Sequence, residues 1–196
     1  MKKVLSLALL STILIAIFSI STIISNPIFA QKSMQTYENE KYGFKIQYPF
    51  DWYYNGFNYL DSTHESLGEF SPGLGISVSM TIQFLPFNNI LTLDQYAKQE
   101  LQKIKDFNIK DSLHFNKLLS FNTSYTLGGK PAYNIVYENW SYSKFNDQVG
   151  YPQYIQVGTV IDGIEYNLRF YAQNTDLYNQ YVPIADKIIN SFEFIQ

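Results

Sequence analysis

The amino-acid sequence predicts an α+β fold, in which an antiparallel β-sheet is flanked by helices. Three observations lead to this prediction: strict alternation of apolar and polar residues in two segments, tight-turn signals between strands, and helical periodicity in two further segments. No internal repeat, low-complexity tract or long linker divides the chain after its first thirty residues. We therefore expect one domain over residues 37–196, preceded by a short tether over residues 31–36.

The N-terminal segment has the layout of an export signal. Lys2 and Lys3 precede a run without charge from Val4 to Ala30. This run exceeds the roughly 7–15 apolar residues of a typical signal and approaches the ~20 needed to span a bilayer. Residues 1–30 are therefore either a cleaved signal peptide, which the Asn26-Pro27 break favours, or an N-terminal membrane anchor. In both cases the lysines remain inside, so we expect the body to be extracytoplasmic, either secreted or anchored at the outer face of the cytoplasmic membrane.

Composition excludes several classes of function. The formal net charge is -3, and this acidic balance argues against a nucleic-acid partner. The chain contains no cysteine, which excludes disulfides, thiolate metal sites and cysteine nucleophiles. It contains 17 tyrosines and 15 phenylalanines, so aromatic side chains must supply much of the core.

The strands are predicted from alternation and turns. Residues 76–84 and 164–172 place apolar side chains on one face and polar side chains on the other. Asp162-Gly163 is suited to a tight hairpin turn and joins the second of these strands to residues 153–161. A glycine pair at Gly128-Gly129 predicts another hairpin between residues 123–127 and 132–140. Such short connections imply antiparallel pairing.

Two helices are predicted from periodicity and capping. Thr92 can cap a helix, and Gln95 completes a capping box three residues later. An apolar stripe then continues to Ile104, which predicts an amphipathic helix lying on the sheet. A second helical pattern covers about residues 177–190. Because Pro183 lacks an N–H group, we expect the regular part of that helix to begin near this residue.

Five segments, read in order, resemble the PsbP-like family of exported domains, named after an extrinsic subunit of photosystem II. The most specific is Tyr42-Gly43-Phe44-Lys45-Ile46-Gln47-Tyr48-Pro49-Phe50-Asp51-Trp52, which is similar to the opening strand and turn of that family. The other four are Thr92–Tyr96, Leu127–Tyr133, Asp162–Tyr166 and Ile188–Phe192.

The resemblance implies an α/β/α sandwich around an antiparallel sheet, related in shape to Mog-type Ran-binding proteins, and it implies no enzyme activity. The family's namesake docks on photosystem II and helps to retain calcium, chloride and manganese, partly through an extended N-terminal segment. Only a few residues lie between the N-terminal signal and the first strand here, so a non-photosynthetic member is expected. Export excludes a nuclear Ran-binding role. No functional residue of the namesake falls on a matching position of this chain.

The densest group of potential metal ligands is Asp61, His64, Glu65 and Glu69, which lie close together in a Gly/Ser-rich segment expected to form a loop. Carboxylate oxygens suit hard cations, so calcium or manganese would be the expected ion. The spacing matches no calcium-loop or His-Glu-x-x-His pattern, and an ordinary solvated acidic loop is the alternative.

The sequence offers few residues for nucleophilic catalysis. His64 and His114 are the two imidazoles, and no Gly-x-Ser-x-Gly motif is present. Ser71 follows His64 by seven residues, a spacing that places them together in no standard element. Gly73-Leu74-Gly75 precedes a strand, which indicates a turn and not a phosphate-binding loop.

The aromatic run after Trp52 is the main candidate for partner contact, because tyrosine and phenylalanine offer large contact areas. The alternative is that some of these side chains pack against the sheet edge. The candidate contact residues are Tyr53, Tyr54, Phe57 and Tyr59.

Together these observations predict a non-catalytic extracytoplasmic module that binds or stabilises a membrane-associated protein complex. An exported protein that binds a ligand or a metal ion is the alternative. A hydrolase is the most remote alternative, because the sequence lacks the residues that hydrolysis would need.

Overall fold

The structure, a computed structural model, describes residues 33–60, 63–85, 91–110, 114–141 and 151–195. They belong to one compact unit that begins at Ser33. Its elements, in chain order, are β1 (Met34–Asn39), β2 (Phe44–Pro49), β3 (Tyr53–Leu60), β4 (His64–Gly73), β5 (Ile76–Phe84), α2 (Leu93–Lys110), β6 (His114–Leu127), β7 (Lys130–Ser141), β8 (Gln153–Ile161), β9 (Ile164–Ala172), α3 (Thr175–Asn190) and β10 (Glu193–Phe194).

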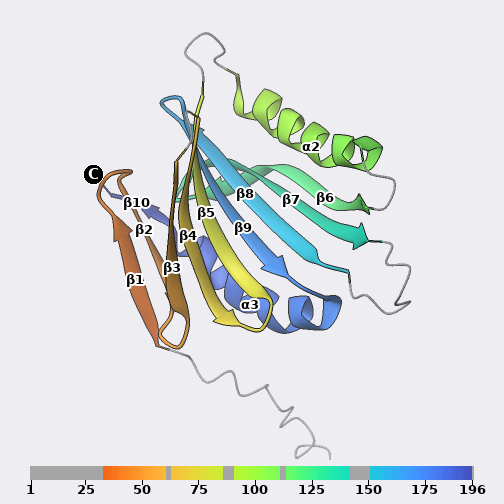
Figure 1. Cartoon of the computed structure of the whole chain (residues 1–196). Helices are drawn as coiled ribbons and strands as arrows, with labels where there is room; N and C mark the ends of the chain where they lie inside the picture. The colour runs from red at the N-terminus through yellow and green to blue at the C-terminus, as the bar shows by residue number, and fades with distance from the viewer. Residues whose placement is uncertain (1–32, 61–62, 86–90, 111–113, 142–150, 196) are drawn as a thin grey trace, which may run out of the picture. The chain divides into compact units, whose positions relative to one another are not determined.

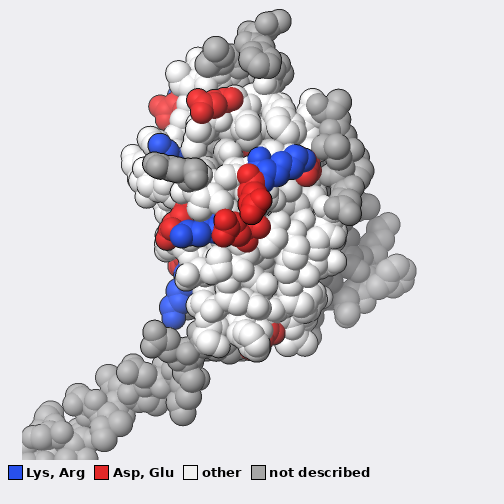
Figure 2. All heavy atoms as spheres, turned by 90° about the vertical axis from the view of Figure 1, so that its left-hand side faces the viewer, with Lys and Arg blue, Asp and Glu red and all other residues white. Residues whose placement is uncertain are grey.

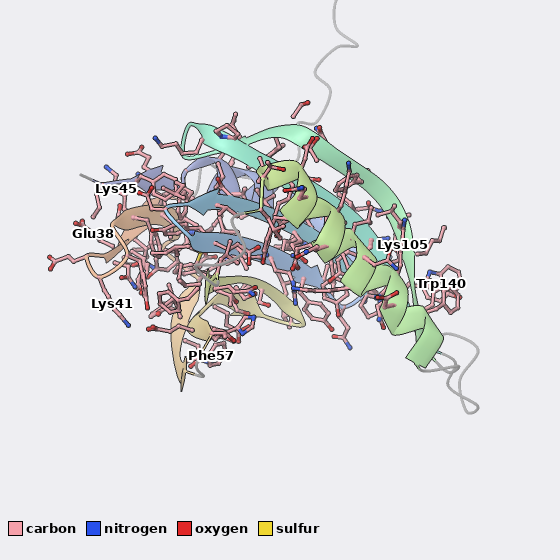
Figure 3. The ribbon with its side chains drawn as sticks, turned by 90° about the horizontal axis from the view of Figure 1, so that it is seen from above. Glu38, Lys41, Lys45, Phe57, Lys105 and Trp140 are labelled. Carbon is pink, nitrogen blue, oxygen red and sulfur yellow. The ribbon has the colours of Figure 1, made fainter. Side chains whose placement is uncertain are left out.

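A seven-stranded antiparallel sheet forms the centre of this unit, in the order β3-β4-β5-β9-β8-β7-β6. A smaller sheet, in the order β1-β2-β10, lies with α3 on one side of it, and α2 lies on the other side (Figure 1). Seen from above, β1 and β2 with Glu38, Lys41 and Lys45 occupy one side of the unit, and α2 with Lys105 occupies the opposite side (Figure 3). The predicted α+β fold, with helices on both sides of an antiparallel sheet, is confirmed.

The main core lies between the central sheet, α3 and the small sheet. The alternation predicted for residues 76–84 and 164–172 holds, because Val78, Leu168 and Phe170 are fully buried on this side. Ile188 of α3 packs into the same cluster. Aromatic rings supply much of the volume, for example Phe44 stacked on Phe192 with ring centroids 5.2 Å apart.

The predicted capping box forms at the start of α2. The backbone N–H of Thr92 donates to Oε1 of Gln95 over 2.9 Å, and the N–H of Gln95 donates to the Thr92 hydroxyl over 3.3 Å. Two backbone donors that have no partner within the helix are thereby satisfied. This fixes where α2 begins.

Helix α3 starts earlier than predicted. The side chain of Asn174 accepts a hydrogen bond from the N–H of Leu177 over 2.9 Å, so regular helix begins at Thr175 and runs through Pro183. The expectation that regular helix begins near Pro183 was therefore wrong. Pro183 and Asn179, whose carbonyl loses its usual donor, are both exposed, so water can take the place of the missing bond.

Both predicted hairpins form through residues with positive φ. Asp162 and Gly163 have φ of 50° and 79° between β8 and β9, and Gly128 and Gly129 have φ of 57° and 74° between β6 and β7. Positive φ at two successive positions matches the right-handed twist of the flanking strands. The turn predicted over Gly73–Gly75 also forms, between β4 and β5.

The segment expected to be a Gly/Ser-rich loop is instead largely the strand β4, paired on both sides. Its glycine and serine content reflects a sheet irregularity: the register shifts between Ser66 and Gly68, and Gly68 has φ of 149°. Strand β1 begins at Met34, inside the stretch predicted as a tether. No helix in the described parts of the chain is both long and apolar enough to cross a bilayer.

Candidate binding surface on the central sheet

Helix α2 covers only part of its side of the central sheet. Helix α2 packs over β6 and β7, where Tyr133 and Ile135 of β7 are buried together with Tyr96 and Ala97 of the helix. Strands β3 and β4, most of β5 and the second half of β9 lie beyond this cluster, and at the end of β5 the Tyr96 hydroxyl donates to the side chain of Gln83 over 2.9 Å. We call the α2 side of these strands the open face; its exposed or half-buried side chains are Tyr53, Asn55, Glu69, Ser77, Ser79, Thr81, Arg169 and Tyr171.

Strand register places these side chains in rows across the sheet. Asn55 pairs with Glu69, Glu69 pairs with Ser79, and Ser79 pairs with Arg169. Residues directly opposite one another in an antiparallel pair point to the same side. Alternation along β9 then puts Arg169 on the α2 side, because its neighbours Leu168 and Phe170 are in the main core. The open face is thus a surface of hydroxyl, amide and phenol groups with two charges, those of Glu69 and Arg169.

A buried polar network separates the open face from the apolar contacts of α2. Glu165 is 3% exposed, and its carboxylate accepts from the hydroxyl of Tyr133, the hydroxyl of Tyr96 and the amide of Asn167, over 2.6, 2.6 and 3.1 Å. Burial raises the pKa of the Glu165 carboxyl above its ordinary value, although these three hydrogen bonds oppose the rise. Burial also raises the pKa of Tyr96 and Tyr133, whose hydroxyls therefore remain donors at neutral pH.

A second buried carboxylate, that of Glu100 in α2, extends the network toward the open face. It is 8% exposed, pairs with Lys103 and accepts from Nε2 of Gln156 over 3.2 Å. Oε1 of Gln156 in turn accepts from the Arg169 guanidinium over 3.3 Å. The side-chain amide of Gln156 therefore links the buried carboxylate of Glu100 to the exposed guanidinium of Arg169.

The opposite flank of the unit carries a different kind of surface. Figure 2 shows acidic and basic side chains gathered together there, on the side that carries the small sheet. Lys45 forms a salt bridge of 2.9 Å with Glu193, and Glu38 lies across from Lys45 in the pairing of β1 and β2. The charges on this flank thus already have partners within the chain, as do Lys41 and Glu65. This flank is a weaker candidate than the open face.

The predicted metal ligands lie on opposite sides of β4. His64 pairs with Gln83 and Glu69 with Ser79, which places both on the α2 side, whereas Glu65 turns the other way. The Glu65 carboxylate accepts from Lys41 over 2.6 Å and from the Tyr42 hydroxyl, and the Lys41 bond holds its pKa below the ordinary value. Asp61 lies outside the described residues. Within the described parts of the chain, no three acidic or histidine side chains converge as a metal site would require, and the metal site stays a prediction.

The aromatic run divides between core and surface. Tyr54 packs against Tyr37 and Phe70, and its hydroxyl donates to the carbonyl of Leu67 over 2.6 Å. Tyr53, one residue earlier, is 54% exposed and belongs to the open face. Phe57 is 37% exposed and lies far from α2 (Figure 3).

The remaining members of the run are less informative for partner contact. Trp52 is buried against Tyr181 of α3, and the side chain of Tyr59 lies outside the described residues. The structure thus shows that Tyr54 packs against the sheet. Partner contact by Tyr53, Phe57 and Tyr59 stays a prediction.

Comparison with known proteins agrees with this architecture. A model of the PsbP-like protein family matches residues 21–194. The chain belongs to the PsbP-like protein family. The resemblance drawn from the five sequence segments is therefore confirmed. Among curated protein sequences, none matches this PsbP-like protein.

Two solved structures share the fold of this PsbP-like protein. The solution structure of cyanobacterial PsbP (CyanoP) from Synechocystis has a TM-score of 0.60 at 15% sequence identity, and the match covers 88% of this chain and 98% of that one. The crystal structure of the Saccharomyces cerevisiae Ran-binding protein Mog1p has a TM-score of 0.51 at 10% identity, covering 84% and 97%. At such identities the likeness shows a common fold only.

Sequence reasoning did not identify the Arg169 network. Arg169 is the only arginine of the chain, which is a signal that composition alone provides. Its partners Gln156 and Glu100 lie 13 and 69 positions away along the chain, in β8 and α2, so no local motif connects them.

Proposed function

We propose that this PsbP-like protein is a non-catalytic binding module outside the cytoplasmic membrane, and that its open face holds a protein belonging to a membrane-associated complex. The observation that carries the proposal is the incomplete cover provided by α2. Strands β3, β4, β5 and β9 present Tyr53, Asn55, Ser79 and Arg169 on a surface that no described helix covers. Aromatic residues and arginine are enriched in protein interfaces relative to the rest of the surface.

The buried acids support binding over catalysis. Glu100 and Glu165 are the strongest candidates for general acid or base on the α2 side, yet both are shielded from solvent and held by hydrogen bonds from the protein itself. A general base must reach a proton of its substrate. These side chains instead accept hydrogen bonds from residues of the sheet and of α2 and orient the side chains around them.

The N-terminal segment and the fold support the location and the type of partner. Lys2 and Lys3 ahead of the uncharged run to Ala30 are the pattern of an export signal or outer-face anchor. The yeast protein with this fold is named for binding another protein, Ran. Binding of a protein partner would therefore not be a new function for this fold.

Crosslinking in intact cells tests the proposal. The full-length protein, tagged at its C-terminus and expressed in its native host, would be treated with an amine-reactive crosslinker, purified under denaturing conditions and analysed by mass spectrometry. We expect linked peptides between this protein and a single membrane-associated partner. Recovery of only free protein at native abundance would contradict the proposal.

A further inference from the structure

Arg169 holds the only guanidinium of the chain, and it lies exposed within the open face. Among the described residues, no carboxylate lies within salt-bridge distance of it. Its one hydrogen bond there is to Oε1 of Gln156, a neutral acceptor, which uses one of the five guanidinium N–H donors. An arginine in such a place retains both its charge and most of its donors for another molecule.

The neighbouring residues help to orient this guanidinium through Gln156. Nε2 of Gln156 donates to Glu100 over 3.2 Å and to the Tyr133 hydroxyl over 3.2 Å. Both amide hydrogens are therefore used, so the amide oxygen must face Arg169. Holding a long side chain before binding lowers the entropy lost when a partner is bound. Gln156 and Glu100 thus act as positioning residues for Arg169.

We propose that Arg169 binds a carboxylate of an acidic side chain on the protein partner, and that the row Ser79, Glu69 and Asn55 continues the contact along the partner. This inference rests on the proposed function and names the chemistry of its interface. A carboxylate matches the planar fork of arginine with two parallel hydrogen bonds. Ser79 lies directly across from Arg169, and its hydroxyl donates to the backbone carbonyl of Arg169 over 3.4 Å, which leaves the hydroxyl oxygen to accept a hydrogen bond from the partner.

Charge in the surroundings favours a single carboxylate over a phosphate group. Glu69 lies two strands from Arg169 in the same row, and the chain as a whole is acidic. A doubly charged phosphate would meet repulsion from both and would gain from only one arginine. A partner segment with an acidic residue facing Arg169 and a basic or polar residue facing Glu69 fits the row.

Four variants test this inference through capture of the partner. Arg169→Gln removes the charge, and Arg169→Lys retains the charge without the fork. Ser79→Glu places a carboxylate directly across from Arg169, where it would occupy the guanidinium. Gln47→Glu adds the same charge at an exposed position of the small sheet and serves as the matched control. Thermal melting of each variant establishes that it is folded.

The probe is a detergent extract of native-host membranes passed over each immobilised full-length variant, with the crosslinked partner quantified by mass spectrometry. We expect Arg169→Gln and Ser79→Glu to lower capture about tenfold, as loss of a charged hydrogen bond implies, with a smaller loss for Arg169→Lys and none for Gln47→Glu. Amidation of extract carboxylates with carbodiimide and glycinamide should abolish capture, whereas phosphatase treatment should not.

The outcomes separate this inference from the proposed function. Wild-type capture that is unchanged in both Arg169→Gln and Ser79→Glu would overturn the role of Arg169 and leave the binding module standing. Loss of capture after phosphatase treatment, with no effect of amidation, would indicate that Arg169 binds a phosphate group. That result would also overturn the proposed role of a carboxylate. Absence of any capture by the wild-type protein would instead contradict the proposed function itself.

Discussion

The hydroxyl of Tyr133 in β7 donates to Oε1 of Glu165 in β9 over 2.6 Å, across the intervening strand β8. Both side chains are buried, and Gly158 of β8 pairs with Tyr133 on one side and with Asn167 on the other. The contact joins three strands beneath α2. The end of the sheet that α2 covers is thus joined by hydrogen bonds between buried side chains as well as by the backbone.

The raised pKa of Glu165 predicts a defined pH dependence of stability. Its pKa exceeds the ordinary 4.5 in the folded state because of burial, so its contribution is fully present below about pH 4.5 and is lost as pH rises through the folded value. The free energy of unfolding of the wild type minus that of Glu165→Gln should therefore fall between pH 4 and pH 7. Urea titrations at several pH values measure this difference. A difference that grows as pH rises would contradict the assignment.

Gly158 is required for space and not for backbone conformation. A Cβ at this position would lie 2.6 Å from Cε1 of Tyr133, a ring that is fully buried and cannot move aside. We expect Gly158→Ala to lower the free energy of unfolding by about 1–3 kcal/mol, as overpacking does. Gly56→Ala is the matched control, because its Cβ would meet Tyr54 at an ordinary 3.4 Å. Equal stability of the two variants in urea titrations would disprove this packing argument.

Alanine substitutions of the adjacent tyrosines Tyr53 and Tyr54 in β3 should change the stability of the protein to different extents. Tyr54→Ala removes a ring packed against Phe70 and the hydrogen bond to Leu67, and we expect a loss of about 2–4 kcal/mol in the free energy of unfolding. Tyr53→Ala removes an exposed ring and should change stability by less than about 0.5 kcal/mol. Thermal melting distinguishes them. If Tyr53→Ala were the more destabilising change, the assignment of faces along β3 would be wrong.

The sequence was sufficient for elements whose signals are local. The capping box at Thr92, the turn at Asp162-Gly163 and the alternation over residues 76–84 each depend on neighbours within a few positions, and each is confirmed. Strand β4 was missed because glycine and serine at an irregular strand look like a loop. The start of α3 was predicted too late in the chain. The effect of Pro183 on the helix depends on whether water can reach the carbonyl that loses its donor, and the sequence does not give this exposure.

The candidate surface was beyond sequence reasoning for a different reason. Whether Tyr53 or Tyr54 faces outward depends on the pairing of β3 with β4, and whether Arg169 is covered depends on where α2 lies. Both are set by contacts between segments far apart in the chain. Alternation along β9 showed that Arg169 is on the polar side, but not that α2 leaves it uncovered.

Site-specific photocrosslinking tests the central claim most directly, namely that the open face is where the partner binds. A photoreactive amino acid would replace Ser79 on the open face or, as control, Gln47 on the small sheet, in the full-length protein within its native host. We predict that Ser79 gives a crosslink to one membrane-associated protein and that Gln47 gives none. A crosslink from Gln47 with none from Ser79 would contradict the claim.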